Sequence, residues 1–335
     1  MASVSRKKSF LNFFPTPASL LLSTSGLAIT DDSIKLIQFH RGLFGQSLKL
    51  SWYEKIPLPP GIVESGFIND AQKLTAILKD LDKGYDFRYV HATLPEERAY
   101  LFSATIDRVP REGLRDAVAF IIEQNVPVSL ANSVFDFDVV EQYKESDQIK
   151  VMVSVLSKKV VDFYVQVLEA AGIRPVSFDI ESQAIARAIV PQGDKQTQLI
   201  INAGLNKTGF YVVENEVVQF TTTLPYGSIS STGESHMGAL KAEIKKIVVY
   251  WNTRGGVAAD SVLPIEKVLL CGPSSLNAEF VTALMDESSM AYSLADVWVN
   301  AENYPSQLPE KFRQEVLDYT EVIGLALPHP HTTYV

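Results

Sequence analysis

Apolar runs of strand length and amphipathic stretches of helix length alternate along the chain. Residues 27–30 and 34–39 are short apolar runs, and residues 47–54 alternate apolar and polar positions with a period of two. A period of two is typical of a strand with one buried face. With the polar turn at residues 31–33 between the first two runs, this segment predicts a small meander of three strands.

Helical spacing follows this meander. Asn69-Asp70 is typical of a helix N-cap, and apolar residues then recur at helical spacing over 71–81. A further helix over 160–171 is predicted to stop at Gly172, because glycine readily adopts the left-handed conformation that ends many helices. The remaining patterns predict helices over 111–124, 240–250, 278–285 and 317–325, and strands over 89–94, 100–105, 135–140, 149–155 and 267–270.

A second meander repeats the plan of the first. Residues 199–202, 209–213 and 216–221 predict three strands, with the hairpin turn of the last two at Glu214-Asn215. Because each meander is followed by a helix and a strand, the chain is predicted to be a duplicated α/β fold. In such folds the turns at the strand ends face each other across a crevice. Glycine or small polar residues in those turns present backbone N–H groups to phosphates.

Composition and charge narrow the class of protein. The length of 335 residues suggests about two domains. The 46% apolar and 21% charged residues exclude global disorder. The chain has 30 Lys and Arg residues against 39 Asp and Glu residues, a net charge of −9, which argues against a nucleic-acid partner. The single cysteine, Cys271, excludes an intrachain disulfide framework, and no apolar run reaches the ~18 residues of a membrane span.

Strings of residues, in order along the chain, resemble one protein family. Residues 26–35 are similar to a first phosphate motif of the form Gly-x-Asp-x-Gly-x-x-x-x-Lys, and residues 202–208 to a second of the form Asp-x-Gly-x-x-x-Thr. Residues 269–274 are similar to an adenosine motif. The other similar strings are 58–63, 66–70, 123–127, 135–137, 168–175, 178–184 and 323–327. Together they cover nearly the whole chain and resemble PilM, the actin-like family of type IV pilus assembly proteins related to FtsA.

The resemblance implies an α/β actin-like fold made of two RNase H-like lobes. It divides the chain into six parts: a flexible N-terminal arm (1–19), subdomain 1A (20–95), an inserted subdomain 1C (96–176), the second lobe (177–310), a C-terminal helix returning toward the first lobe (311–327), and a tail (328–335). Only twelve residues separate Gly227 from Leu240. The helical lid that the family carries there, called 2B, is therefore expected to be missing or reduced to the loop Ser228–Gly238.

The resemblance also implies a cleft for Mg-ATP, and this sequence departs from the family pattern there. The candidate cofactor-binding residues are Asp31, Asp32, Ser33, Lys35, Gly204, Asn206, Lys207, Thr208, Gly272 and Ser274. Ala28 stands where the family has an aspartate that organises the metal, and its methyl group offers no oxygen ligand. Thr30 replaces a phosphate-loop glycine, Asn202 the second aspartate, and Pro273 a glycine of the adenosine loop. We therefore expect little or no ATP hydrolysis, no catalytic residue, no metal site and no required cofactor, with Mg-ATP binding as an open alternative.

Several of these residues also have a structural interpretation. Residues 31–33 are typical of an ordinary polar turn, residues 206–208 could form a hairpin turn, and Lys35 could extend from its strand toward solvent. Asp179 and Glu181 suggest paired acid and base chemistry, but we favour a salt bridge at the domain junction.

Three functions stay open. The first is an adaptor of type IV pilus or related secretion machinery, peripheral to the cytoplasmic side of the inner membrane. The resemblance implies that it binds the cytoplasmic tail of a PilN-like single-pass protein in a groove between subdomains 1A and 1C, with an assembly ATPase or a second copy as further partners. The second function is a nucleotide-binding PilM-type ATPase. The third is a small-molecule kinase of the same superfamily, against which Ala28 and Asn202 count.

Overall fold

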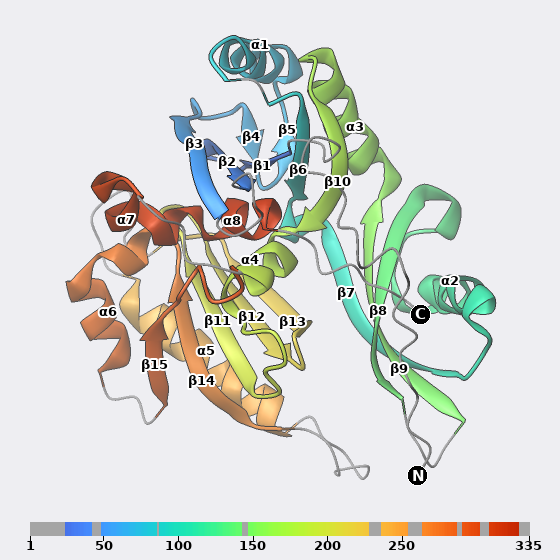
Figure 1. Cartoon of the computed structure of the whole chain (residues 1–335). Helices are drawn as coiled ribbons and strands as arrows, with labels where there is room; N and C mark the ends of the chain where they lie inside the picture. Colours follow the sequence, from blue (N-terminus) through green and yellow to red (C-terminus); the bar gives the residue numbers. More distant parts are fainter. Residues whose placement is uncertain are drawn as a thin grey trace.

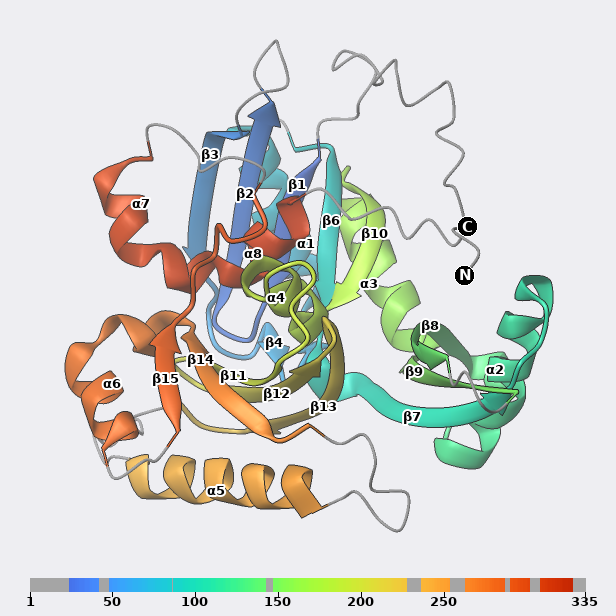
Figure 2. The same cartoon turned by 60° about the horizontal axis from the view of Figure 1, so that its bottom comes forward.

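The computed structural model describes residues 24–41, 48–85, 87–142, 147–227, 236–253, 263–286, 290–301 and 308–327. The predicted arm (1–19) and tail (328–335) lie outside this part, as does most of the loop predicted in place of 2B, residues 228–235. Within the described part, no helix combines the length and the apolar character needed to cross a membrane. Figures 1 and 2 show two lobes stacked on each other and a smaller unit that projects to one side.

A five-stranded mixed sheet forms the first lobe, in the order β10-β6-β1-β2-β3. Its strands are β1 (Ser25–Ile29), β2 (Ser33–Arg41), β3 (Leu48–Pro57), β6 (Tyr89–Leu94) and β10 (Arg174–Ile180). The first three form the predicted meander, and β6 and β10 run parallel to β1. Helices α1 (Ala71–Asp82) and α3 (Lys158–Ala170) pack against one face of this sheet. The side chain of Asp70 caps α1 as predicted, and Gly172 (φ 88°) follows the end of α3.

The second lobe repeats this topology. Its sheet has the order β13-β12-β11-β14-β15, so three antiparallel strands are again followed by two parallel ones. The strands are β11 (Thr197–Ala203), β12 (Thr208–Glu214), β13 (Val217–Leu224), β14 (Ile265–Cys271) and β15 (Ala291–Leu294). Helices α5 (Met237–Thr253) and α6 (Ala278–Met285) cover its outer face. The predicted duplication of an α/β unit is thereby confirmed.

Two helices lie between the sheets and join the lobes. They are α4 (Glu181–Ile189) and α8 (Thr320–Ala326), and one apolar core contains both helices and residues of both sheets. Successive side chains of β1 serve different cores: Leu27 packs with α1 and α3, whereas Ala28 belongs to the core shared by the lobes. Gly324 allows α8 to approach α4 closely, because a Cβ at this position would overlap the carbonyl oxygen of Ala184. The lobes are therefore parts of one packed body.

A third sheet, in the order β7-β9-β8, stands outside both lobes (Figure 2). Its strands and helix are β7 (Ala99–Asp107), β8 (Ser133–Gln142), β9 (Gln148–Ser157) and α2 (Arg111–Asn125), which together we call the third-sheet module. Val118 and Ile122 of α2 are fully buried against the sheet. The smaller elements nearby are the β4–β5 hairpin (Val63–Glu64 and Phe67–Ile68) and the 3-10 turns η3 (Glu96–Arg98) and η4 (Leu130–Asn132). The hairpin and η3 lie where the module meets the first lobe.

The structure differs from the predicted elements at a few places. The hairpin turn of the second meander lies at Asn215-Glu216 and not at Glu214-Asn215, because Glu214 still pairs with Val217. Both turn residues have positive φ (51° and 66°), as a two-residue type I′ turn requires. The predicted last helix is split into the 3-10 turn η6 (Val316–Tyr319) and α8, after a short α7 (Glu310–Glu315). The strand patterns missed β10 and β15, and the helical patterns missed α4.

Candidate functional site

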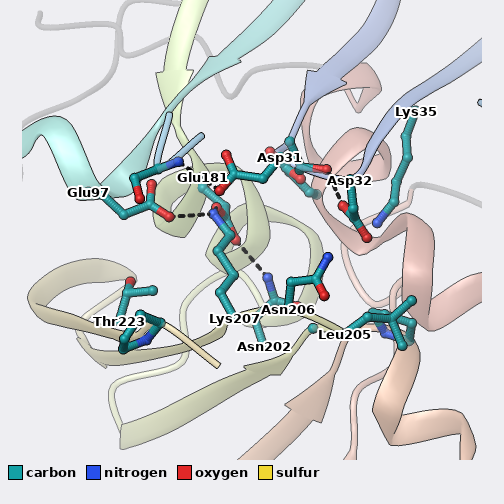
Figure 3. A pocket seen from close by; sticks show the side chains of 16 residues that line it. Asp31, Asp32, Lys35, Glu97, Glu181, Asn202, Leu205, Asn206, Lys207 and Thr223 are labelled. Atoms are coloured by element: carbon teal, nitrogen blue, oxygen red, sulfur yellow. Dashed lines mark hydrogen bonds and ion pairs between the residues drawn. The ribbon is translucent and has the colours of Figure 1, made fainter. Parts of the chain in front are cut away.

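The first turns of the two meanders face each other across a cleft between the lobes, as the sequence predicts. The cleft has a volume of about 160 Å³. Of the ten predicted residues, six line it: Asp31, Asp32, Lys35, Gly204, Asn206 and Lys207. Sequence reasoning did not place Glu97 and Glu321 here, and both line the same cleft together with Glu181. Figure 3 shows Glu97 and Glu181 on either side of the Lys207 ammonium group.

The other four predicted residues do not line the cleft, and they fix the backbone around it. Ser33 closes the first turn, since its backbone carbonyl accepts hydrogen bonds from Thr30. The hydroxyl of Thr208 donates to the carbonyl of Tyr226 (3.1 Å). The hydroxyl of Ser274 donates to the carbonyl of Gly204 (3.1 Å). Gly272 has φ 85°, and a Cβ there would overlap the second meander, so its role is also to shape the loop.

Lys35 is buried and does not extend toward solvent. Its Nζ donates to Oδ1 of Asp318 (2.6 Å) and to the backbone carbonyl of the same residue (2.7 Å). Lys55 donates to the other carboxylate oxygen, Oδ2, at 2.5 Å. Burial alone would raise the pKa of Asp318, but the two ammonium groups outweigh burial and hold that pKa below its usual value. The Lys35 charge is therefore already matched within the chain.

Lys207 is held in the same way by two carboxylates. Its Nζ lies 2.8 Å from Oε2 of Glu181 and 2.9 Å from Oε1 of Glu97. Oε1 of Glu181 also accepts hydrogen bonds from the Asn202 amide (2.7 Å) and the Tyr211 hydroxyl (3.1 Å). Burial would raise the pKa of Glu181, but Lys207 and these donors outweigh it and lower the pKa. Lys207, a candidate for phosphate binding from the sequence, and Asn202, which replaces an aspartate of the family pattern, thus both bind one internal carboxylate.

The two aspartates of the first turn serve different partners. Asp32 accepts hydrogen bonds from the side chains of Thr30 (2.6 Å) and Ser33 (3.3 Å), so it stabilises its own turn. Asp31 reaches across to the β4–β5 hairpin and accepts from the backbone N–H groups of Ser65 (2.8 Å) and Gly66 (3.1 Å). The interpretation of residues 31–33 as a polar turn is therefore confirmed.

The residues of the cleft do not fit a magnesium nucleotide. Five carboxylates line it against two ammonium groups, and both ammonium groups are already bound by carboxylates. Ala28 is fully buried in the shared core and presents no oxygen to a metal. In the described part of the chain, no three His, Cys, Asp or Glu side chains gather so as to hold a metal ion. Burial, and to a lesser extent the nearby Glu181 charge, raise the pKa of Glu321 to about 7.

The remaining predicted roles are structural. Asp179 forms a salt bridge with Arg187 at 2.8 Å, and Glu181 forms one with Lys207, as favoured from the sequence. Cys271 is fully buried, and burial raises the pKa of its thiol. These groups therefore have structural roles at the junction of the lobes.

A second, larger cavity lies where the first lobe meets the third-sheet module. This groove has a volume of about 1110 Å³ and is lined by the β4–β5 hairpin, η3, the start of β7 and the first turns of α3. Three aromatic side chains of the lining are unusually exposed for their type: Phe67 at 48%, Tyr100 at 41% and Phe163 at 36%. The guanidinium group of Arg98 lies 3.6 Å from the centre of the Phe67 ring. Sequence reasoning placed a groove between these parts but named none of its residues, because they come from four separate segments of the chain.

Comparison with known proteins gives a family and a fold. Residues 26–248 match the family described as "Type IV pilus assembly protein PilM". No curated protein sequence matches the chain. A solved structure titled "PilM-PilN type IV pilus biogenesis complex" has a TM-score of 0.76 at 19% identity, covering 91% of this chain and 98% of that chain.

Two further solved structures are less similar. The ethanolamine utilization protein EutJ from Carboxydothermus hydrogenoformans has a TM-score of 0.48 at 12% identity, covering 92% of this chain and 90% of that one. The cytoplasmic domain of EpsL, from the type II secretion system of Vibrio cholerae, has a TM-score of 0.48 at 9% identity, covering 86% and 91%.

Proposed function

The chain belongs to the PilM family of type IV pilus assembly proteins, and we propose that it is an adaptor that binds the cytoplasmic tail of a PilN-like inner-membrane protein. The observation that carries this proposal is the aromatic groove between the first lobe and the third-sheet module. The solved structure of similar fold is a complex of PilM with PilN, which supports a partner of the PilN type for this chain as well. We propose that the third-sheet module is the inserted subdomain 1C of the family.

The groove has the chemistry of a site for an extended peptide. Such sites provide pockets for a few side chains, and buried aromatic contacts supply most of the binding free energy. Phe67, Tyr100 and Phe163 offer exposed ring area from three elements that the fold already holds in place. A flexible tail loses conformational entropy when it binds, so a preformed wall improves its affinity.

The cleft between the lobes supports an adaptor better than an enzyme. Phosphoryl transfer depends on positioned charges that act on the nucleotide, and the cations of this cleft are engaged by Asp318, Glu97 and Glu181. We therefore propose that the chain hydrolyses little or no ATP and requires no cofactor. Ala28 and Asn202 argue against the small-molecule kinase, because neither position holds a carboxylate.

We further propose that the protein works at the cytoplasmic side of the inner membrane, where its partner's tail would hold it. Self-association or contact with an assembly ATPase would then build a larger complex on this adaptor. The twelve residues between β13 and α5 are too few for a helical lid, which is consistent with a cleft that no longer needs to close on a nucleotide.

Site-specific photo-crosslinking in cells tests this proposal. A benzophenone amino acid replaces Phe163, which lines the groove, or Phe120, which lies on α2 and is 74% exposed. We expect a crosslink to the PilN-like protein of the same organism from position 163 and none from position 120. A crosslink from position 120 alone would place the partner on another face, and the groove would not be its site.

A further inference from the structure

The turn of the β4–β5 hairpin separates the cleft from the groove. Ser65 lines the cleft, and its neighbour Gly66 lines the groove. Both residues have positive φ (48° and 73°), so they form a two-residue turn of the type I′ pattern. A Cβ at Gly66 would overlap the ring of Pro95, so this turn is packed against the chain that enters η3. One small turn is therefore a wall of both cavities.

Side chains from three other segments hold every backbone polar group of this turn. On the cleft side, Asp31 accepts from the N–H of Ser65 (2.8 Å) and the N–H of Gly66 (3.1 Å). On the groove side, Arg98 donates to the carbonyl of Ser65 (2.9 Å), and the Tyr164 hydroxyl donates to the carbonyl of Gly66 (3.1 Å). Hydrogen bonds with a charged partner are the stronger kind. Three of the four hydrogen bonds to the turn have a charged partner, which is Asp31 or Arg98.

The position of the turn sets the position of a groove aromatic. Phe67 follows Gly66 directly, and its ring lies under the Arg98 guanidinium group that also binds the turn. If the turn moved, the ring and the guanidinium group would have to move with it. The cleft residue Asp31 is thus connected to the groove residue Phe67 through two backbone N–H groups.

We propose that Asp31 is a positioning residue for the groove: it fixes the hairpin wall from the cleft side, so that the groove is preformed whether or not a ligand lies in the cleft. This inference rests on the proposed function, and it adds which residue keeps the groove in its binding-competent arrangement. The apparent affinity of a site falls in proportion to the fraction of molecules that hold the binding-competent arrangement. Loosening the turn should therefore weaken tail binding although Asp31 does not line the groove.

The test compares Asp31→Asn with Asp32→Asn in the full chain. Both changes remove one negative charge from neighbouring residues of the same turn, but only Asp31 binds the hairpin. In Asp31→Asn, the side-chain amide oxygen can accept one of the two N–H bonds, and the NH₂ group then faces the other donor. The two readouts are hydrogen exchange at the amides of residues 65 and 66, measured without peptide, and the affinity for the synthetic cytoplasmic tail of the PilN-like protein.

We expect faster exchange at these amides in Asp31→Asn and about five- to tenfold weaker tail binding, with both quantities near wild type in Asp32→Asn. In a Phe67→Ala background, Asp31→Asn should cause little further loss, because its effect passes through Phe67. Unchanged exchange, or faster exchange with unchanged affinity, would overturn the positioning role of Asp31. Failure of the wild-type chain to bind any tail would instead overturn the proposed function, and the exchange measurement would still report whether Asp31 holds the turn.

Discussion

The ammonium group of Lys207 lies 2.8 Å from Oε2 of Glu181, so the lysine of the second phosphate motif is bound by a carboxylate of its own chain. Lys207 precedes β12 in the second lobe, and Glu181 begins α4 in the core shared by the lobes. Glu97, the other partner of Lys207, belongs to η3 beside the groove. Lys207, a candidate for nucleotide binding from the sequence, is here part of the connection between the lobes and the groove.

Substituting Lys207 by methionine should destabilise the protein. The change leaves the carboxylate of Glu181 buried without its cation, and breaking a buried pair in this way costs about 3–5 kcal/mol. Since Lys207 lowers the pKa of Glu181, the loss should be larger at about pH 8 than at about pH 5, where Glu181 can take up a proton. Urea denaturation at the two pH values measures it.

Lys246→Met is the matched control for this substitution. Lys246 also pairs with a glutamate, Glu243, but its side chain is 75% exposed. Exposed pairs contribute little, so the change should be below about 0.5 kcal/mol. Equal effects of the two substitutions would contradict a structural role for the Lys207 pair.

Glu321→Gln should stabilise the protein at high pH. Burial first and the Glu181 charge second raise the pKa of Glu321 to about 7, from 4.5 for an ordinary glutamate. The folded state therefore binds the Glu321 proton more tightly than the unfolded chain does. The contribution of this proton to the free energy of unfolding is present at low pH and is lost as the pH rises from about 4.5 to about 7. Glutamine mimics the protonated form, so it should add up to about 3 kcal/mol at about pH 8 and little at about pH 5. A gain that is the same at both pH values would rule out this titration.

Gly324→Ala should separate the two helices between the lobes. The new methyl group would overlap the carbonyl oxygen of Ala184 on α4, and overpacking of this kind costs about 2 kcal/mol or more. Gly238→Ala, in α5, is the control, because its Cβ would meet nothing within 4 Å. Alanine is the better helix former, so the control should be stabilised by up to about 1 kcal/mol. Thermal denaturation of both variants should give shifts of opposite sign.

Millimolar Mg-ATP should leave the thermal midpoint of the protein within about 1 °C, since a ligand that does not bind the folded state cannot stabilise it. The reason is the excess of carboxylates in the cleft and the engagement of Lys35 and Lys207. A large upward shift, or magnesium-dependent phosphate release by the purified chain, would show that nucleotide displaces these internal partners.

Local patterns were enough to predict most of the fold. The period-two alternation of residues 47–54 and the helical spacing after Asp70 depend on neighbours in sequence, and both elements form as predicted. Strand β10 and helix α4 were missed as elements, although their residues were among the family strings. Helix α4 packs between the lobes with most of its side chains buried, so its apolar positions leave no simple period. Strand β10 is instead the edge strand of the first sheet, where exposed and partly buried side chains give a weak strand pattern.

The partners in the cleft could not be predicted from the sequence. Lys35 and Asp318 are 283 positions apart, and Lys207 and Glu97 are 110 apart. These pairs meet only because the lobes pack through α4 and α8. The sequence identified the residues at the two phosphate turns, but which charge each one would meet depended on the packed structure. The groove lining is a further case, since the β4–β5 hairpin, η3 and α3 converge on it from separate parts of the chain.

Binding of a PilN-like tail in the aromatic groove can be measured by calorimetric titration. The synthetic tail is titrated into wild type, Phe67→Ala and Phe120→Ala. Phe67 lines the groove at 48% exposure, whereas Phe120 is 74% exposed and lies outside the groove lining. Both variants lose one exposed phenylalanine ring, so they differ only in whether that ring lies in the groove.

We predict that the tail binds the wild type with a single site, that Phe67→Ala weakens binding at least about tenfold, and that Phe120→Ala leaves it unchanged. Equal affinity of wild type and Phe67→Ala for the tail, or a loss confined to Phe120→Ala, would show that the aromatic groove is not the binding site.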